Sequence, residues 1–450
     1  QLQGGQTSID AKSIPTNLTA ARTRMKGQEF YMNHRYKLGF WKITPPNDSI
    51  PGDTIEHRTF IPVTSFAWTF DYNDGHHTFY NNSPSEADAF WGRNYLTTSN
   101  SESPTSYWSM RNSFGVSLME GFNKYAKAGL SAYVTHEIRR YTQTPDTLAI
   151  AGADRPEILT PYPYDTRIAG RSTENLLWVG GQLTKQQGRI LRYEATARFG
   201  IVGPAAGEIL AQGNISTRFK LFGDSIRLTA YGLFANEAAP YLMNNYVSNY
   251  FMWHNDFSKT RRFRVGGEIY VPLTGTLLNV GVENVQNALY FNEESMPVQH
   301  GGSVQVLSAS LSQNFSVGIL NWNNKVTFQT SSEQSVIPLP KLAVYSNLFI
   351  RFRVAKVLYV DLGVDCDYYT KYYAPGYQPA TMSFYNQRST KVGNYPFMNV
   401  YANMKLKRAR FYIMMSHVNQ GMMGDNYFAM PLYPMNPRRF QMGVSVDFAN

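Results

Sequence analysis

The chain has 450 residues, of which 16% are charged and 14% aromatic, with a mean hydropathy of -0.35 and a formal net charge of +10. Soluble domains carry about 25% charged residues, and no segment approaches the roughly 18 consecutive apolar residues of a transmembrane helix. The composition therefore argues against an ordinary soluble protein and a helical membrane protein. The basic residues are spread along the chain, which argues against nucleic acid as a partner.

The chain begins with an N-terminal segment, residues 1–29, which we interpret as an additional strand or a periplasmic extension. Its first residues lack the charged and apolar regions of a signal peptide, so we expect a mature exported protein or a chain whose beginning is missing. The first clear strand lies near residues 30–44. We interpret residues 30–450 as a transmembrane β-barrel.

Alternation of apolar and polar residues recurs along the chain, in roughly 17 segments of about the 9–11 residues that a tilted strand needs to cross a bilayer. Successive side chains of a strand point to opposite faces, so alternation indicates an apolar face and a polar face. Clear examples span residues 108–118, 128–139, 191–199, 262–271, 307–312, 342–354, 358–367 and 399–406.

One hairpin is predicted together with its register. A three-residue turn at Ala355–Val357 pairs Val354 with Leu358 on the apolar face, and the same register places Arg351 opposite Asp361 on the polar face. A slip of one residue would turn charges toward lipid.

The connections alternate in length. The short ones lie at residues 120–123, 185–188, 222–224, 275–276, 355–357 and 407–409, and the long ones at 74–104, 142–172, 236–258, 374–394 and 421–436. Short periplasmic turns and long extracellular loops are typical of outer-membrane barrels. We therefore predict an all-β, antiparallel up-and-down β-barrel of about 16–18 strands in the bacterial outer membrane. A soluble β-sandwich is the weaker alternative.

The polar face is rich in arginine and forms the candidate lumen or constriction. The candidates are Arg111, Arg139, Arg192, Arg198, Arg218, Arg227, Arg262, Arg264, Arg351, Arg353, Glu194, Glu268, Asp361 and Asp365. One interpretation is a positive field that concentrates anions. The other, which we favour, is a network of ion pairs that stiffens the wall, and the two can coexist.

Three other features of the sequence give weaker evidence about function. Tyr and Trp at strand ends suit interfacial girdles, namely Tyr107, Trp108, Tyr141, Trp178, Tyr290 and Tyr395. The stretch from Asp71 to His77 lacks metal-ligand spacing and contains an Asp-Gly turn signal. His136 and His417 are candidates for rim catalysis by position alone, on the lipid-facing register. We expect no enzyme, no cofactor and no metal.

The segment from Arg261 to Phe291 contains a strand exit of the form V-E-N-x-x-N-x-x-Y-F, carried by Val282, Glu283, Asn284, Asn287, Tyr290 and Phe291. It resembles the "putative porin" family of Bacteroidota, Gram-negative bacteria. The closing stretch, residues 440–448, is similar to the terminal strand of bacterial barrels. The resemblance implies passive transport across the outer membrane.

Together these features predict a porin-like channel for small hydrophilic solutes, with a polar lumen narrowed by inward-folding loops. A non-conducting barrel that acts as scaffold or accessory subunit of a larger outer-membrane complex is the alternative. An energised TonB-dependent transporter would need 22 strands and a plug domain. The expected partners are the lipid bilayer with its lipopolysaccharide, small solutes and, for the scaffold, other outer-membrane proteins.

Overall fold

The computed structural model describes residues 18–45, 56–123, 125–143, 165, 167–188, 190–221, 223–424 and 427–448. Within them, the first strand begins at Ala21 and not near residue 30, so residues 21–29 are part of that strand. The rest of the expected N-terminal segment, residues 1–17, lies outside the described residues.

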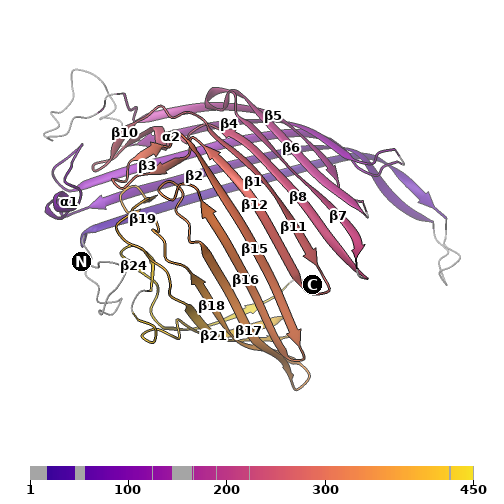
Figure 1. Cartoon of the computed structure of the whole chain (residues 1–450). Helices are drawn as coiled ribbons and strands as arrows, with labels where there is room; N and C mark the ends of the chain where they lie inside the picture. Colours follow the sequence, from indigo (N-terminus) through magenta and orange to yellow (C-terminus); the bar gives the residue numbers. More distant parts are fainter. Residues whose placement is uncertain are drawn as a thin grey trace. The chain divides into compact units, whose positions relative to one another are not determined.

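Seventeen strands of the described chain form one sheet, within the expected 16–18 (Figure 1). They are β1 (Ala21–Thr44), β2 (His57–Asn81), β3 (Ser101–Leu118), β4 (Gly129–Gln143), β5 (Arg171–Lys185), β6 (Leu191–Val202), β7 (Ile209–Leu221), β8 (Asp224–Glu237), β11 (Thr260–Val271), β12 (Thr276–Gln286), β15 (Ser303–Val317), β16 (Leu320–Ser331), β17 (Leu342–Val354), β18 (Leu358–Tyr369), β21 (Phe397–Leu406), β22 (Ala409–Ser416) and β25 (Arg439–Val446). Pairing of consecutive long strands in antiparallel register confirms the up-and-down order.

The remaining elements are short and lie in the connections. They are the strand pairs β9 (Asn245–Val247) with β10 (Met252–His254), β13 (Leu289–Phe291) with β14 (Pro297–Gln299), β19 (Gly376–Gln378) with β20 (Ser383–Tyr385) and β23 (Phe428–Met430) with β24 (Tyr433–Pro434), and the helices α1 (Pro84–Trp91), α2 (Tyr241–Asn244) and η3 (Gly203–Ala205). Among the described residues, no helix has the length and apolarity to cross a membrane.

The chain divides into two compact units. The first consists of Leu18–Thr217 and Tyr231–Phe263, and the second contains the rest of the described chain. In the first unit, β1 to β7 pair in chain order. In the second, β12, β15, β16, β17, β18, β21, β22 and β25 do the same.

The predicted β17–β18 hairpin is confirmed in its register. Val354 pairs with Leu358 and Arg351 with Asp361. Arg351 donates from Nε and Nη2 to the two carboxylate oxygens of Asp361 at 2.7 and 2.9 Å. Ala355 and Lys356 have φ values of 49° and 60°, the left-handed conformation whose twist matches that of paired strands.

The β2–β3 connection differs from the prediction. The Asp74-Gly75 dipeptide predicts a turn, but β2 continues to Asn81 and the loop covers only residues 82–100. Gly75 pairs with Gly27 on one side and with Tyr107 on the other. Ladder partners on both sides therefore outweigh the local turn preference of the dipeptide.

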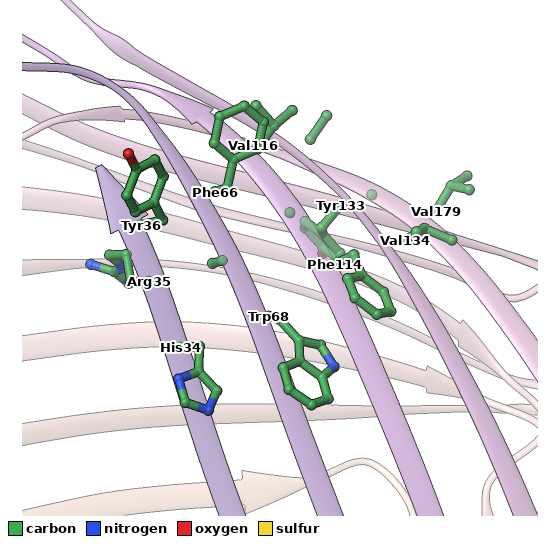
Figure 2. A pocket seen from close by; sticks show the side chains of 14 residues that line it. His34, Arg35, Tyr36, Phe66, Trp68, Phe114, Val116, Tyr133, Val134 and Val179 are labelled. Atoms are coloured by element: carbon green, nitrogen blue, oxygen red, sulfur yellow. The ribbon is translucent and has the colours of Figure 1, made fainter. Parts of the chain in front are cut away.

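One face of the first unit is apolar and exposed. Figure 2 shows side chains of this apolar face on β1 to β5. The ring of Trp68 stacks on those of His34 and Phe114, with ring centres 5.6 and 6.1 Å apart. Trp68 pairs with Phe114 and Phe114 with Val134 across the sheet. Exposed aromatic and branched side chains in adjacent strands are what a lipid-facing surface requires.

The faces on which the predicted girdle residues lie show that most of them do not form an aromatic girdle. Trp108 lies on the apolar side of β3, as a girdle requires, but Tyr141 and Trp178 are buried on the polar face. Tyr107 pairs with Tyr141, with ring centres 5.1 Å apart, and therefore shares that face. Of the two girdle candidates in connections, Tyr395 is buried and Tyr290 packs on an apolar cluster.

Tyrosines of the polar face lie over glycines of the neighbouring strand at three places. The cross-strand pairs are Tyr133 with Gly180, Tyr401 with Gly363, and Tyr412 with Gly443. A Cβ atom added at these glycines would come within 2.4 to 2.8 Å of the tyrosine side chain. Only a residue without a side chain leaves room for the ring.

Candidate functional site

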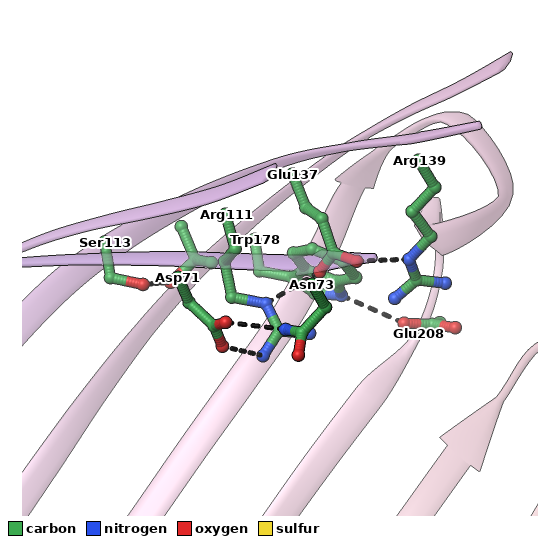
Figure 3. Close-up of polar contacts among 9 residues, drawn as sticks. Asp71, Asn73, Arg111, Ser113, Glu137, Arg139, Trp178 and Glu208 are labelled. Atoms are coloured by element: carbon green, nitrogen blue, oxygen red, sulfur yellow. Dashed lines mark hydrogen bonds and ion pairs between the residues drawn. The ribbon is translucent and has the colours of Figure 1, made fainter. Parts of the chain in front are cut away.

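A cluster of charges lies on the polar face of β2, β3 and β4 (Figure 3). Glu137 of β4 is fully buried and accepts a hydrogen bond from Arg111 Nε at 2.7 Å and another from Arg139 Nε. Arg111 also lies 3.9 Å from Asp71, through its Nη1 atom. One buried carboxylate thus joins two arginines from neighbouring strands, and the alternation of β3 and β4 places all three groups on one face.

Trp178 of β5 borders this cluster. The guanidinium groups of Arg139 and Arg198 lie 5.9 and 5.4 Å from the centre of its ring, and its indole Nε1 donates to Glu208 at 2.9 Å. Trp178 is buried with Leu176 and Ala205. Trp178 is predicted from the sequence as an interfacial girdle residue, although Glu174 and Gln182 share its parity on β5 and indicate the polar face.

The connection between β8 and β11, residues 238–259, covers the loop end of this polar face. We call it the β8–β11 loop. Its residues from Tyr246 to Trp253 are all buried. The hydroxyl of Tyr250 is 2.8 Å from both Asn81 Nδ2 and Ser101 Oγ, which belong to β2 and β3.

The same loop is also attached to β4. Gln143 accepts from the amide of Val247 at 2.9 Å and donates to the carbonyl of Asn245 at 3.2 Å. Tyr241 stacks on Tyr141 with ring centres 4.5 Å apart. Tyr141 is two residues from Arg139 on the same face of β4, which places the two residues about 7 Å apart along the strand. The β8–β11 loop therefore reaches the edge of the charge cluster.

The other predicted polar-face residues fall into two groups, according to the kind of group that each contacts. Carboxylate partners are found for Arg198 with Glu237 at 3.6 Å, Arg264 with Glu283 at 2.8 Å, and Arg351 with Asp361 at 2.7 Å. Glu194 accepts from Gln182, and Asp365 from Asn399, at 2.7 and 2.6 Å.

Several arginines contact groups other than carboxylates. Arg192 donates to the carbonyl of Gly188 at 3.0 Å, Arg227 lies over the ring of Tyr270, and Arg353 contacts the hydroxyl and ring of Tyr359. Arg218 is exposed on β7, and Arg262 and Glu268 are half-buried on β11. These residues thus make local contacts of several kinds, and their assignment to a constriction stays a prediction.

The two histidines considered for catalysis have different environments. His136 is exposed on the apolar side of β4, opposite Asn112. His417 is not lipid-facing as predicted but fully buried beyond the end of β22, 2.7 Å from Tyr395 Oη and 2.8 Å from the carbonyl of Asn436. Burial lowers the pKa of His417 below its ordinary value. No group of potential metal ligands occurs among the residues that the structure describes.

Comparison with protein families gives a match that extends over the whole chain. Residues 1–450 match the family described as "Putative porin". No curated protein is similar to the chain.

Solved structures with a similar fold are outer-membrane receptors and transporters. The ferric enterobactin receptor PfeA in complex with BCV-L6 is 10% identical with a TM-score of 0.56, over 99% of this chain and 73% of that one. A PfeA double mutant from Pseudomonas aeruginosa is 11% identical with a TM-score of 0.60, over 94% and 62%. The copper transporter OprC is 11% identical with a TM-score of 0.61, over 96% and 67%. At these identities the likeness shows the fold, an outer-membrane β-barrel, and no substrate.

Proposed function

The chain belongs to the "Putative porin" family and is a porin-like barrel of the bacterial outer membrane, and on this basis we propose that it is a channel for passive diffusion of small hydrophilic solutes. The V-E-N strand exit at Val282–Asn284 leads us to propose a Bacteroidota, Gram-negative origin as well. The solutes cross without an energy source, through a polar interior.

The observation that carries this proposal is the position of the β8–β11 loop on the polar face. In barrels of this class the polar face lines the interior, so a loop held there by Tyr250 and Gln143 narrows the path from inside. The charge cluster around Glu137 lies at the edge of that loop. A narrowed, charged passage discriminates solutes by size and charge.

We also propose that the channel prefers anions. Glu137 neutralises part of the charge of Arg111 and Arg139, so the cluster itself contributes little net positive charge. Arg192 and Arg353 instead contact a carbonyl and a tyrosine, neither of which cancels their charge. Positive charge that is not paired raises the local concentration of anions.

Planar-bilayer recordings of the purified full chain test both parts. Stepwise openings of roughly nanosiemens size, with a reversal potential on the anion side in a potassium chloride gradient, would support the channel. Arg192→Gln is expected to reduce the anion preference. Lys185→Gln, at the same turn but on the apolar side, is the matched control and should leave it unchanged.

Absence of current at all voltages would overturn the channel and favour the alternative of a scaffold or accessory subunit in a larger outer-membrane complex. Its partners would then be other outer-membrane proteins, which purification from native membranes would reveal. Under either function the lipid bilayer is a partner, and we propose no enzymatic activity, no cofactor and no nucleic acid.

A further inference from the structure

A row of basic residues crosses β1 to β5 on the same side of the sheet as the apolar face. The hydrogen-bonded register aligns Lys26 with His76, His76 with Ser106, Ser106 with Thr142 and Thr142 with Arg171. These positions have the parity of Trp68 and Phe114, so alternation turns them toward the membrane and away from the interior. Lys26, His76 and Arg171 are exposed.

The row next to it, toward the apolar face, contains Trp108 and Arg140. Trp108 pairs with Arg140, whose guanidinium carbon lies 5.4 Å from the centre of the indole system. Arg140 Nε also donates to Thr173 Oγ1 at 3.2 Å. Two contacts thus hold one guanidinium at the boundary between an aromatic ring and the basic row, which is the environment of a membrane interface.

Charge on this side is strongly one-signed. Arg24 and Arg22 continue the basic series along β1, and Arg22 lies 4.7 Å from the ring centre of Tyr80. Within the described strands β1 to β5, the acidic residues with this orientation are Asp74, which is 3.1 Å from His76, and the exposed Glu102. We call Arg22, Arg24, Lys26, Arg140 and Arg171 the outer basic row; on this side of strands β1 to β5, five cations lie with two carboxylates.

The position of the outer basic row along the strands indicates which leaflet of the membrane it faces. It lies at the end of β2 to β5 from which the long connections of residues 82–100 and 144–170 leave, opposite to the short turn of residues 186–190. Long loops of outer-membrane barrels are extracellular. The row therefore meets the headgroup region of the outer leaflet, directly above apolar residues such as Met110 and Ile138.

We propose that the outer basic row is a binding site for the phosphate groups of outer-leaflet glycolipid, that is, lipopolysaccharide. Arginine binds phosphate oxygens through paired N–H donors, and a guanidinium already held by Trp108 and Thr173 loses little freedom on binding. The acyl chains would lie on the apolar face beside Trp68 and Phe114. This inference rests on the outer-membrane location and is independent of whether the barrel conducts.

The test is a titration of the purified full chain in detergent with lipopolysaccharide, with the same glycolipid after dephosphorylation, and with inorganic phosphate. The test variant carries Arg24→Gln, Lys26→Gln and Arg171→Gln. The matched control carries Lys42→Gln, Lys127→Gln and Lys185→Gln, three cations at the turn end of the same strands and hairpins. Circular dichroism and resistance to unfolding by dodecyl sulfate establish that both variants are folded.

Each basic residue near an anionic headgroup contributes enough attraction that removal of three should weaken binding by at least roughly ten-fold. We expect this loss for the test variant, an unchanged affinity for the control, and weaker binding of the dephosphorylated glycolipid to the parent chain. Equal binding by both variants, or equal binding of the two glycolipids, would overturn the proposal. Tight binding of inorganic phosphate alone would also overturn it, because the site would then be a free-anion site.

Discussion

Replacement of Glu137 by glutamine should destabilise the barrel measurably. The carboxylate is fully buried and accepts from Arg111 and Arg139, whose side chains are 44% and 27% exposed. Removing one partner of a fully buried ion pair costs about 3–5 kcal/mol. Because solvent reaches both guanidinium groups, part of that cost is screened, and we expect a loss of about 2–3 kcal/mol in the free energy of unfolding.

The same substitution should change ion selectivity. Glutamine keeps the shape of Glu137 but removes its negative charge and leaves Asp71 as the carboxylate near Arg111, so the net charge of the charge cluster rises by one. In planar bilayers the reversal potential should move further toward the anion side. Urea unfolding in lipid vesicles measures the stability change on the same variant.

Glu102→Gln is the matched control, because this carboxylate of β3 is exposed on the apolar side of the sheet. It should leave stability within about 0.5 kcal/mol of the parent and the reversal potential unchanged. If Glu137→Gln unfolds at the same urea concentration as Glu102→Gln and shows the same selectivity, the carboxylate does not hold the cluster together.

Three further outcomes are expected. A double-mutant cycle on Arg351→Ala and Asp361→Ala should give a coupling free energy of only about 0.5 kcal/mol, because the arginine side chain is 57% exposed and solvent screens such pairs. The cycle is measured by denaturant unfolding, and a coupling free energy above about 2 kcal/mol would contradict this expectation. Tyr250→Phe removes a hydroxyl that contacts two buried polar residues, at a cost of about 1–3 kcal/mol, so limited proteolysis should cut residues 238–259 faster and channel conductance should rise. Burial is the largest influence on His417 and depresses its pKa; the bond to the carbonyl of Asn436 raises the pKa, and Arg438, the smallest influence, depresses it. The stability that neutral His417 provides is therefore fully present above the pKa of the unfolded chain, near 6.5. It is lost as the pH falls from that value toward the lower pKa of the folded state. Proteolytic cleavage of residues 417–438 should therefore increase between about pH 7 and about pH 5, and His417→Gln should remove this pH dependence.

The sequence predicts those features in which strand periodicity and turn length act together. Arg351 and Asp361 could be paired in advance because only one register puts charges on the polar face and closes the hairpin at Val354 and Leu358. The same reasoning places Arg111 and Arg139 on one face. It does not predict that a single buried Glu137 joins them, because periodicity fixes the face on which a side chain lies and not how completely its neighbours cover it.

Features that depend on distant contacts could not be predicted. Tyr250 meets Asn81 across 169 residues of sequence, and nothing in the local pattern of either residue signals the contact. His417 was assigned to the apolar register by extending the alternation of β22 one residue too far. There the backbone turns to a φ of 53°, and parity no longer has meaning outside the strand.

The tyrosines that lie over glycines have a consequence for the width of the proposed channel. Each ring of Tyr133, Tyr401 and Tyr412 rests along the wall, in the space that its glycine leaves open. The hydroxyl end of each tyrosine therefore lies against the neighbouring strand, where a Cβ atom would otherwise stand. In the proposed channel, Gly180→Ala would displace the ring of Tyr133 from the wall, because the added Cβ atom would lie 2.4 Å from Tyr133 Cζ. One methyl group would therefore move a whole phenol ring.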